Sequence, residues 1–295
     1  MSTFSYFPGC SLEKMSLSYH QSAIQSTKVL GVDLQEIDDW NCCGATTYFH
    51  VDEILAYTLV ARNLAIAEKT GHDLVAPCSA CYKNTYFTNT YLKEDQDLAD
   101  HINYALQQDN LHFSGEIDVK HLMEVFVDDV GFDQIQNKTT HPLEGLRVAP
   151  YYGCQLVRPR KDHEDVENPR FFEDLIGAIG AEPVDYAYRL RCCGGSLIIT
   201  CREAALSLVH DLLQSAVNSE ADVIATSCPM CQTNLECYQM QVNQEFGTNY
   251  SIPIMFFTQL TGLALGVPKK KLGIGTEFIS TDKIVAYAKE KIHID

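Results

Sequence analysis

The sequence predicts an α/β protein made of two pseudo-symmetric repeats, each with a short parallel sheet flanked by helices. A cysteine pattern that occurs twice indicates an internal duplication. Short apolar runs alternate with segments of helical periodicity in both halves, which favours parallel strands joined by helices. The 295 residues are enough for two domains of roughly 100–200 residues each. We therefore expect a first repeat at residues 1–145 and a second at residues 146–295.

The repeated pattern consists of a single cysteine, an adjacent cysteine pair and a CxxC motif. In both halves 34 residues separate the adjacent pair from the CxxC. Ten of the twelve cysteines belong to these two sets, which are Cys10, Cys42, Cys43, Cys78 and Cys81 in the first and Cys154, Cys192, Cys193, Cys228 and Cys231 in the second. Because thiolates are preferred ligands of soft metal centres, the pattern predicts one metal site in each repeat.

The first half predicts three strands and two helices. Short apolar runs predict strands at 3–7, 34–37 and 73–77, which lead into the single cysteine, the cysteine pair and the CxxC. Helical periodicity predicts helices at 17–30, which ends before Gly31, and at 52–68.

The second half repeats this organisation. A buried strand is expected at 222–226, directly before the second CxxC. A helix with an apolar face is expected to begin at a capping box formed by Thr200 and Glu203. An asparagine follows each CxxC by three residues, at Asn84 and Asn234. Ligands of parallel α/β folds collect at the carboxyl ends of the strands, so we expect every cysteine group at such an edge.

Charge and hydropathy exclude some classes of function. The net charge of −17 argues against a nucleic-acid surface, which needs an excess of lysine and arginine. The sequence contains no run of about 18 apolar residues, and its start lacks the features of a secretory signal. We therefore expect a cytoplasmic protein without a membrane span. In that reducing compartment many cysteines indicate metal binding or redox chemistry.

The number of cysteines limits the kind of metal centre. A tetrahedral zinc site takes four ligands, and so does an ordinary cubane iron–sulfur cluster, so five cysteines exceed both. Side chains of adjacent cysteines diverge, so their sulfurs would most easily reach different irons of an extended cluster. Zinc and a vicinal disulfide within each adjacent pair stay open as alternatives.

The doubled arrangement of a single cysteine, a Cys-Cys-Gly and a CxxC resembles the CCG-domain proteins. With both repeats complete, the chain is most similar to the family of catalytic B subunits of heterodisulfide reductase. The resemblance covers nearly the whole chain, including the segment 257–266. It implies two non-cubane [4Fe–4S] clusters, each held by one of the five-cysteine sets. It also implies two-electron reduction of the disulfide of coenzyme M and coenzyme B, a step of methanogenesis.

The resemblance further implies a multisubunit complex. A ferredoxin-like C subunit would deliver electrons from a flavin-containing A subunit, which is capable of electron bifurcation, often together with a hydrogenase or a formate dehydrogenase. The sequence agrees with an external source of electrons, because it contains neither a CxxCxxC run nor a GxGxxG motif.

Some residues near the cysteines are candidates for other roles. Tyr48 and His50 follow the first cysteine pair and are candidate proton donors, although either could simply pack beside the cluster. The amides of Gly44, Gly194 and Gly195 could donate hydrogen bonds to cluster sulfides. A tight turn would explain these glycines equally well.

Six of the eight arginines lie between residues 158 and 202, around the second cysteine set. An arginine fork suits the sulfonate, phosphate and carboxylates of the two coenzymes, so a basic entrance would attract an anionic disulfide substrate. The candidate entrance residues are Arg158, Arg160, Lys161, Arg191 and Arg202. Surface ion pairs or a partner interface are the alternative roles.

Other features lie outside the repeated pattern. Cys201 and Cys237 are expected to be buried free thiols. The acidic run at Glu94, Asp95, Asp97 and Asp100 is expected to be a solvated helix start. Two other functions stay open, namely a CCG oxidoreductase that acts on another disulfide or is linked to a quinone or a hydroxyacid module, and a non-catalytic zinc scaffold.

Overall fold

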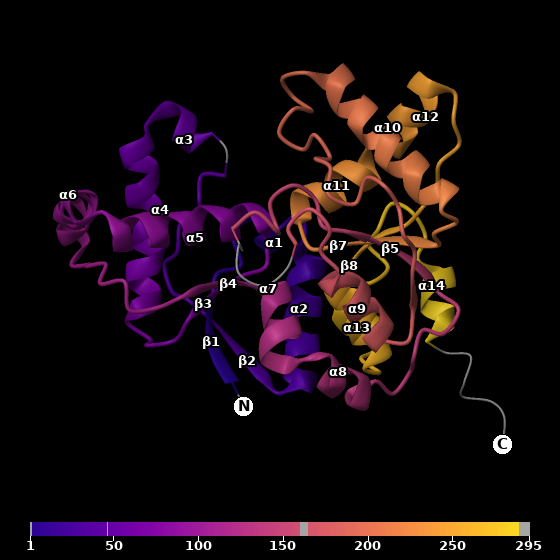
Figure 1. The fold of residues 1–295 in the computed structure, drawn as a ribbon, viewed down its shortest axis with the longest axis horizontal. Helices are drawn as coiled ribbons and strands as arrows, with labels where there is room; N and C mark the ends of the chain where they lie inside the picture. The colour runs from indigo at the N-terminus through magenta and orange to yellow at the C-terminus, as the bar shows by residue number, and fades with distance from the viewer. Residues whose placement is uncertain (1, 46, 160–164, 289–295) are drawn as a thin grey trace.

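The computed structural model describes residues 2–45, 47–159 and 165–288, and it contains two four-stranded parallel sheets (Figure 1). The strand order is β2-β1-β3-β4 in the first sheet and β6-β5-β7-β8 in the second, so the two sheets have the same topology. The strands of the first sheet are β1 (Ser2–Tyr6), β2 (Val32–Glu36), β3 (Leu74–Ala76) and β4 (Val119–His121). Those of the second are β5 (Arg147–Tyr151), β6 (Glu182–Pro183), β7 (Val223–Thr226) and β8 (Ile254–Phe256). This arrangement confirms the predicted fold class.

Helices connect the strands and cover both sheets. In the first half they are α1 (Cys10–Glu13), α2 (Leu17–Leu30), α3 (Tyr48–Val51), α4 (Glu53–Glu68), α5 (Ser79–Glu94), α6 (Gln96–Leu106), η1 (Gln107–Asp109), α7 (Leu122–Glu124), η2 (Val125–Val130) and α8 (Phe132–Lys138). In the second half they are α9 (Phe171–Ala178), α10 (Arg202–Asn218), α11 (Pro229–Cys237), α12 (Gln239–Phe246), α13 (Phe257–Ala264), η3 (Lys269–Leu272) and α14 (Asp282–Tyr287).

The predicted helices and strands occur where the sequence placed them, with one wrong helix start. The helix α2 ends before Gly31, which adopts a left-handed conformation with φ of 87°. The expected capping box at Thr200 and Glu203 is wrong. Helix α10 begins at Arg202 after Cys201, and no side chain forms a cap hydrogen bond there. The first turn of α10 therefore lacks the side-chain acceptor that the motif predicted.

The acidic run before α6 forms a helix start, as expected. The Asp95 carboxylate accepts a hydrogen bond from the backbone N–H of Leu98 and so caps α6. Within the ranges that the structure describes, no helix is both long and apolar enough to cross a lipid bilayer.

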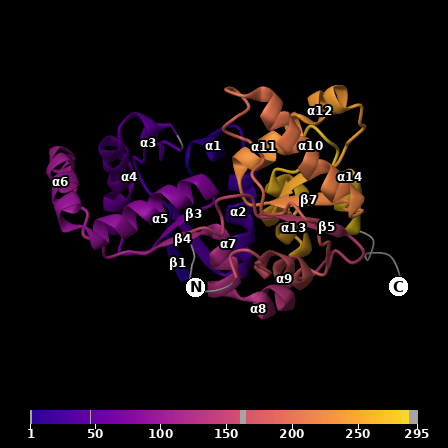
Figure 2. The same cartoon turned by 45° about the horizontal axis from the view of Figure 1, so that its top comes forward.

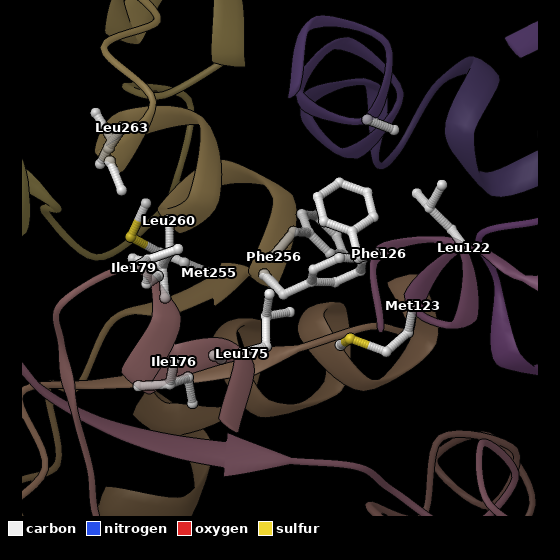
Figure 3. Close-up of a cluster of buried hydrophobic side chains, with 14 of the residues drawn as sticks. Leu122, Met123, Phe126, Leu175, Ile176, Ile179, Met255, Phe256, Leu260 and Leu263 are labelled. Atoms are coloured by element: carbon white, nitrogen blue, oxygen red, sulfur yellow. The ribbon is translucent and has the colours of Figure 1, made fainter. Parts of the chain in front are cut away.

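The two sheets share a buried apolar core. Figure 3 shows side chains from α7, η2, α9, β8 and α13 that pack against one another between the repeats. The Phe126 and Phe257 rings pack edge to face at 5.1 Å, and the Phe172 ring meets Phe257 at 6.2 Å. These contacts join residues on both sides of position 145. The expected domain division at 1–145 and 146–295 stays a prediction.

Helix α2 of the first repeat packs against α13 of the second, and both lie near the middle of the molecule (Figure 1). The Ser22 hydroxyl is 2.6 Å from the Thr258 hydroxyl, and the Ser26 hydroxyl donates to the Thr258 carbonyl at 2.8 Å. All three side chains are buried, so these polar contacts hold the helices in one register.

Candidate metal centres

The sheet topology brings the cysteines of each set together at one edge. Cys10 and Cys78 follow the central strands β1 and β3, and Cys154 and Cys228 follow the matching strands β5 and β7. In both views α1 of the first repeat and α11 of the second lie side by side (Figure 1, Figure 2). The two cysteine sets therefore face each other across the junction between the repeats.

The sulfur atoms of the first set meet in pairs. The Cys42 sulfur lies 3.7 Å from that of Cys10, and the Cys43 sulfur lies 3.3 Å from that of Cys81. The backbone N–H of Gly44 donates to the Cys42 sulfur at 3.4 Å. Each adjacent cysteine thus has a further cysteine partner, and the two side chains also hydrogen-bond to each other.

The second set has the same pairing. The Cys193 sulfur lies 3.6 Å from that of Cys231, and Cys192 hydrogen-bonds to Cys154. The backbone N–H of Gly194 donates to the Cys192 sulfur at 3.3 Å, which matches Gly44 in the first repeat. Both repeats therefore provide five thiols and a glycine amide that donates to the first cysteine of the adjacent pair.

All twelve cysteines are free thiols, so neither adjacent pair forms a vicinal disulfide. Among the described residues, no three histidine, cysteine, aspartate or glutamate side chains converge as ligands of a single metal ion. Hydrogen bonds link the thiols of each set one after another instead.

The two sets touch through the first cysteine of each CxxC. A hydrogen bond to Cys228 raises the pKa of the Cys78 thiol, and hydrogen bonds from Cys231 and Cys78 lower the pKa of the Cys228 thiol. Both side chains are buried, at 4% and 6% exposure. A thiol of one repeat therefore lies in direct contact with a thiol of the other.

Asn84 and Asn234 hold the loops that carry the adjacent cysteines. The Asn84 amide donates to the carbonyls of Cys43 and Ala45, at 3.1 and 2.8 Å. The Asn234 amide donates to the carbonyl of Cys193. The sequence showed that both asparagines repeat, and the structure gives the reason, because each ties a CxxC helix to its Cys-Cys-Gly loop.

Two further glycines allow the backbone to approach the cysteines closely. A Cβ atom at Gly9 would lie 2.8 Å from the Cys81 sulfur, and one at Gly153 would lie 3.3 Å from the Cys231 sulfur. Both residues have positive φ, of 72° and 68°, which glycine adopts without strain. Sequence reasoning missed this role, although each glycine directly precedes the single cysteine of its repeat.

A cavity of about 50 Å³ adjoins the second set. Its lining residues come from both repeats and are Ser79, Ala80, Tyr152, Gly153, Cys154, Gln155, Cys192, Cys193, Gly195, Ser196, Cys228, Met230 and Cys231. Five thiols around a small, partly open space, with amide donors directed at the sulfurs, fit an iron–sulfur cluster.

The candidate proton donors lie on the short helix α3. The Tyr48 ring packs against Gly44, next to the first cysteine pair, and is 42% exposed. His50 is exposed on the same helix. Their role in proton transfer stays a prediction.

The candidate entrance residues have different surroundings. The Arg158 guanidinium donates to the Cys154 carbonyl at 2.7 Å, and Arg202 is exposed at the start of α10. Arg191 is engaged elsewhere, because its guanidinium lies 3.2 Å from the Asp211 carboxylate and 4.4 Å from the centre of the Tyr188 ring. Arg160 and Lys161 lie outside the described residues. The role of these residues in substrate binding stays a prediction.

Another arginine of this cluster has a structural contact. Arg189 forms an ion pair with the buried carboxylate of Glu173 at 3.3 Å. Its carbonyl accepts hydrogen bonds from the backbone N–H groups of Tyr152 and Gly153, directly before Cys154. Arg189 therefore supports the loop that carries the single cysteine of the second set.

The two cysteines outside the pattern are free thiols, as expected. The expectation that both are buried is wrong: Cys201 is exposed directly before α10, and Cys237 is only partly buried at the end of α11. The solvent-exposed start of α10 explains the difference.

Comparisons with known proteins agree with this arrangement. The family model described as a cysteine-rich domain, CCG, matches residues 4–84 and 148–236. The chain is 34% identical to the 8-methylmenaquinol:fumarate reductase membrane anchor subunit of Wolinella succinogenes, over 95% of this chain and 98% of that protein. It is 31% identical to the B subunit of the ferredoxin/F420H2-dependent CoB-CoM heterodisulfide reductase of Methanosarcina acetivorans, over 97% of both chains.

A solved structure has the same fold. The crystal structure of a hypothetical protein from Helicobacter pylori superposes with a TM-score of 0.77 at 15% sequence identity. It matches 95% of this chain, which spans only 52% of that longer chain.

Proposed function

The chain belongs to the family of cysteine-rich CCG-domain proteins, and from this premise we propose that it is the catalytic subunit of a heterodisulfide reductase. Its reaction is the two-electron reduction of the disulfide of coenzyme M and coenzyme B to the two thiols. The observation that carries this proposal is the contact between Cys78 and Cys228, which makes neighbours of two complete five-cysteine sets. A reaction that needs two electrons and releases two thiols suits two adjacent redox centres.

The ten cysteines of the two sets hold two non-cubane [4Fe–4S] clusters. When bound, such clusters supply one-electron transfer and iron atoms with affinity for sulfur. The backbone amides of Gly44 and Gly194 stabilise negative charge on the sulfurs of Cys42 and Cys192. Asn84 and Asn234 keep the adjacent cysteines in place by holding the carbonyls of Cys43 and Cys193.

The disulfide binds at the junction between the two sets. Arg158 and Arg202 are exposed cations beside the second set and attract the anionic groups of the substrate. The paired Arg191 contributes less, because Asp211 already neutralises part of its charge. Tyr48 or His50, close in sequence to the first cysteine pair, supplies a proton to a departing thiolate.

The electrons come from partner proteins of the same complex. We propose that a ferredoxin-like C subunit is the direct donor and that a flavin-containing A subunit reduces it, with electron bifurcation at the flavin. A hydrogenase or a formate dehydrogenase would complete the assembly. Relatives named as subunits of heterodisulfide reductases support a multisubunit assembly. We propose that this assembly lies in the cytoplasm.

The relative from Wolinella succinogenes favours a second candidate function. It is 34% identical and is named as a subunit of an 8-methylmenaquinol:fumarate reductase. In this alternative, the ten cysteines would hold the same two clusters for one-electron transfer from a quinol toward a separate catalytic protein, and no disulfide would be cleaved.

Metal analysis and substrate assays test the proposal. Protein purified without oxygen should contain about eight irons and eight acid-labile sulfides per chain. With reduced donor it should cleave the coenzyme M–coenzyme B disulfide. Iron without disulfide cleavage, but with electron transfer from a reduced menaquinone, would support the second candidate. About two zincs per chain without sulfide would identify a scaffold and exclude both reactions.

A further inference from the structure

Two carbonyl groups at the junction of the repeats share one hydrogen-bond donor. The Tyr19 hydroxyl lies 3.0 Å from the carbonyl oxygen of Pro77 and 3.1 Å from that of Ser227. Pro77 directly precedes Cys78, and Ser227 directly precedes Cys228. A single side chain of α2 therefore connects the two strand ends that carry the CxxC motifs.

The environment of Tyr19 fixes its hydroxyl as a donor. The side chain is fully buried, and burial raises the pKa of Tyr19 well above 10, so the hydroxyl keeps its proton. The ring stacks on Phe256 of the second repeat, with centroids 4.1 Å apart and planes 5° from parallel. Contacts on both sides of the junction thus hold the ring and its hydroxyl.

His121 contacts the same two carbonyls from the end of β4. Its ring contacts the Pro77 and Ser227 carbonyls, its Nε2 lies 3.5 Å from the Ser79 hydroxyl, and its Nδ1 accepts the backbone N–H of Met123 at 3.0 Å. Burial lowers the pKa of His121 to about 4, so the ring is neutral. Since Nδ1 accepts, Nε2 carries the proton and can donate.

We infer that Tyr19 is a positioning residue that, together with His121, fixes the separation of Cys78 and Cys228 and thereby the separation of the two metal sites. This inference rests on the proposed function of the two sets as cluster sites. Hydrogen bonds to the carbonyl directly before each ligand restrain the two strand ends, so that two redox centres act on one substrate.

The test compares two single variants of the full chain, each of which removes one buried hydroxyl from α2. Tyr19→Phe removes the donor to Pro77 and Ser227, whereas Ser26→Ala removes a donor to the Thr258 carbonyl in the same interface, farther along the helix. Iron content and the magnetic interaction between the two clusters are measured on wild type and both variants. The interaction is read by electron paramagnetic resonance with both clusters paramagnetic, and it weakens steeply with distance.

We expect Tyr19→Phe to keep its iron but to show a weaker interaction than wild type and Ser26→Ala. Its kcat for disulfide cleavage should fall by about tenfold with KM unchanged, since small displacements of reacting groups are costly. Loss of iron by a folded Tyr19→Phe, with Ser26→Ala intact, would also support the inference. An interaction equal to that of Ser26→Ala would overturn it.

Further comparisons decide the remaining outcomes. If Tyr19→Phe does not fold, the test uses His121→Phe, which removes the other donor. This variant introduces the residue type that the second repeat has at the matching position, Phe256. An unchanged magnetic interaction between the clusters would then overturn the inference. If wild type contains no iron, the proposed function fails separately. In that case the rate of disulfide formation between Cys78 and Cys228 under diamide is compared, and equal rates in Tyr19→Phe and Ser26→Ala would overturn the inference.

Discussion

At the end of its fourth strand the first repeat has His121, and the second repeat has Phe256 at the matching position. His121 pairs with Ala76 in the sheet and Phe256 pairs with Thr226, so the two positions are equivalent in register. One side chain hydrogen-bonds to the strand ends and the other stacks on Tyr19. The repeats therefore have the same sulfur pairing and the same asparagine contacts, while the residues around them have diverged.

This difference separates two kinds of constraint. Five sulfurs and the loops that carry them must meet one metal centre, so the cysteine pairs, Gly44, Gly194, Asn84 and Asn234 keep the same geometry in both repeats. Residues that contact the substrate, the partner or the other repeat have no such restriction. Comparing matched variants in the two repeats can therefore separate metal binding from other roles.

The largest effect is expected from removing one buried ligand in each repeat. Cys43→Ser and Cys193→Ser should each lose about half of the bound iron, and turnover should fall by about 100-fold or more, because both clusters are needed. Iron and sulfide analysis with a turnover assay would check this. Cys201→Ser, at an exposed cysteine outside the sets, is the control. Full activity in either ligand variant would break the equivalence of the repeats.

A smaller effect is expected from the asparagines that hold the cysteine loops. Asn84→Ala and Asn234→Ala should each lower iron retention or turnover by about 10–100-fold, since groups that orient ligands contribute this much. Asn89→Ala is the matched control, because Asn89 is also buried on α5 but donates to the Ile117 carbonyl. Iron release to a chelator measures the effect. If Asn89→Ala releases iron as fast as Asn84→Ala, the loop contact is not the cause.

Stability should depend on pH through Glu236 of the second repeat and, in the opposite direction, through His121 of the first, whose pKa is lowered to about 4. Five residues after the CxxC, the first repeat has Tyr86 and the second has Glu236. Burial raises the pKa of Glu236 from 4.5 to about 7, and its carboxylate accepts the backbone N–H groups of Phe278 and Ile279. At Glu236 the folded protein thus binds more protons than the unfolded chain between these pH values, so the contribution of Glu236 to stability falls as pH rises through 7.

Glu236→Gln should remove this dependence. The rise of the Glu236 pKa from 4.5 to about 7 corresponds to a loss of about 3 kcal/mol in this residue's contribution to the free energy of unfolding between pH 4.5 and pH 8. Denaturant unfolding at both pH values, with the exposed Glu245→Gln as control, measures it. An equal pH dependence of stability in wild type and Glu236→Gln would contradict the assignment, because the contribution of His121 is the same in both.

The smallest effect concerns the exposed cations near the single cysteines. Arg158 lies four residues after Cys154, and Lys14 lies four residues after Cys10. If the entrance lies beside the second set, Arg158→Ala should raise KM for the disulfide by about threefold to tenfold, as expected for loss of one charge-assisted hydrogen bond, and iron content should stay unchanged. Steady-state kinetics at low salt would detect this. A larger effect in Lys14→Ala would place the entrance beside the first set.

The sequence predicted the parts of the fold that depend on local pattern. Apolar runs before Cys10 and Cys78 were read correctly as strands because their length and boundaries are local properties. The contact of Tyr19 with Ser227 spans 208 positions, and no local pattern encodes it. The exposure of Cys201 was missed for a similar reason, because burial depends on which elements pack over a residue.

The candidate site also combines features that local sequence predicts with features that depend on packing. The ten cysteines could be grouped from spacing alone, and their placement at the strand ends follows from the parallel topology. The engagement of Arg191 with Asp211 depends on the facing helix α10, so charge clustering in the sequence could not reveal it.

The difference between His121 and Phe256 shows that two identical copies of one repeat could not form this centre. A symmetric dimer of single repeats must place the same residue at both equivalent positions, because a two-fold axis relates every contact to its copy. Two histidines would leave Tyr19 without its stacking partner, and two phenylalanines would leave the carbonyls without their second donor. A chain that contains both repeats can carry one of each, so covalent linkage permits a centre with two chemically different sides.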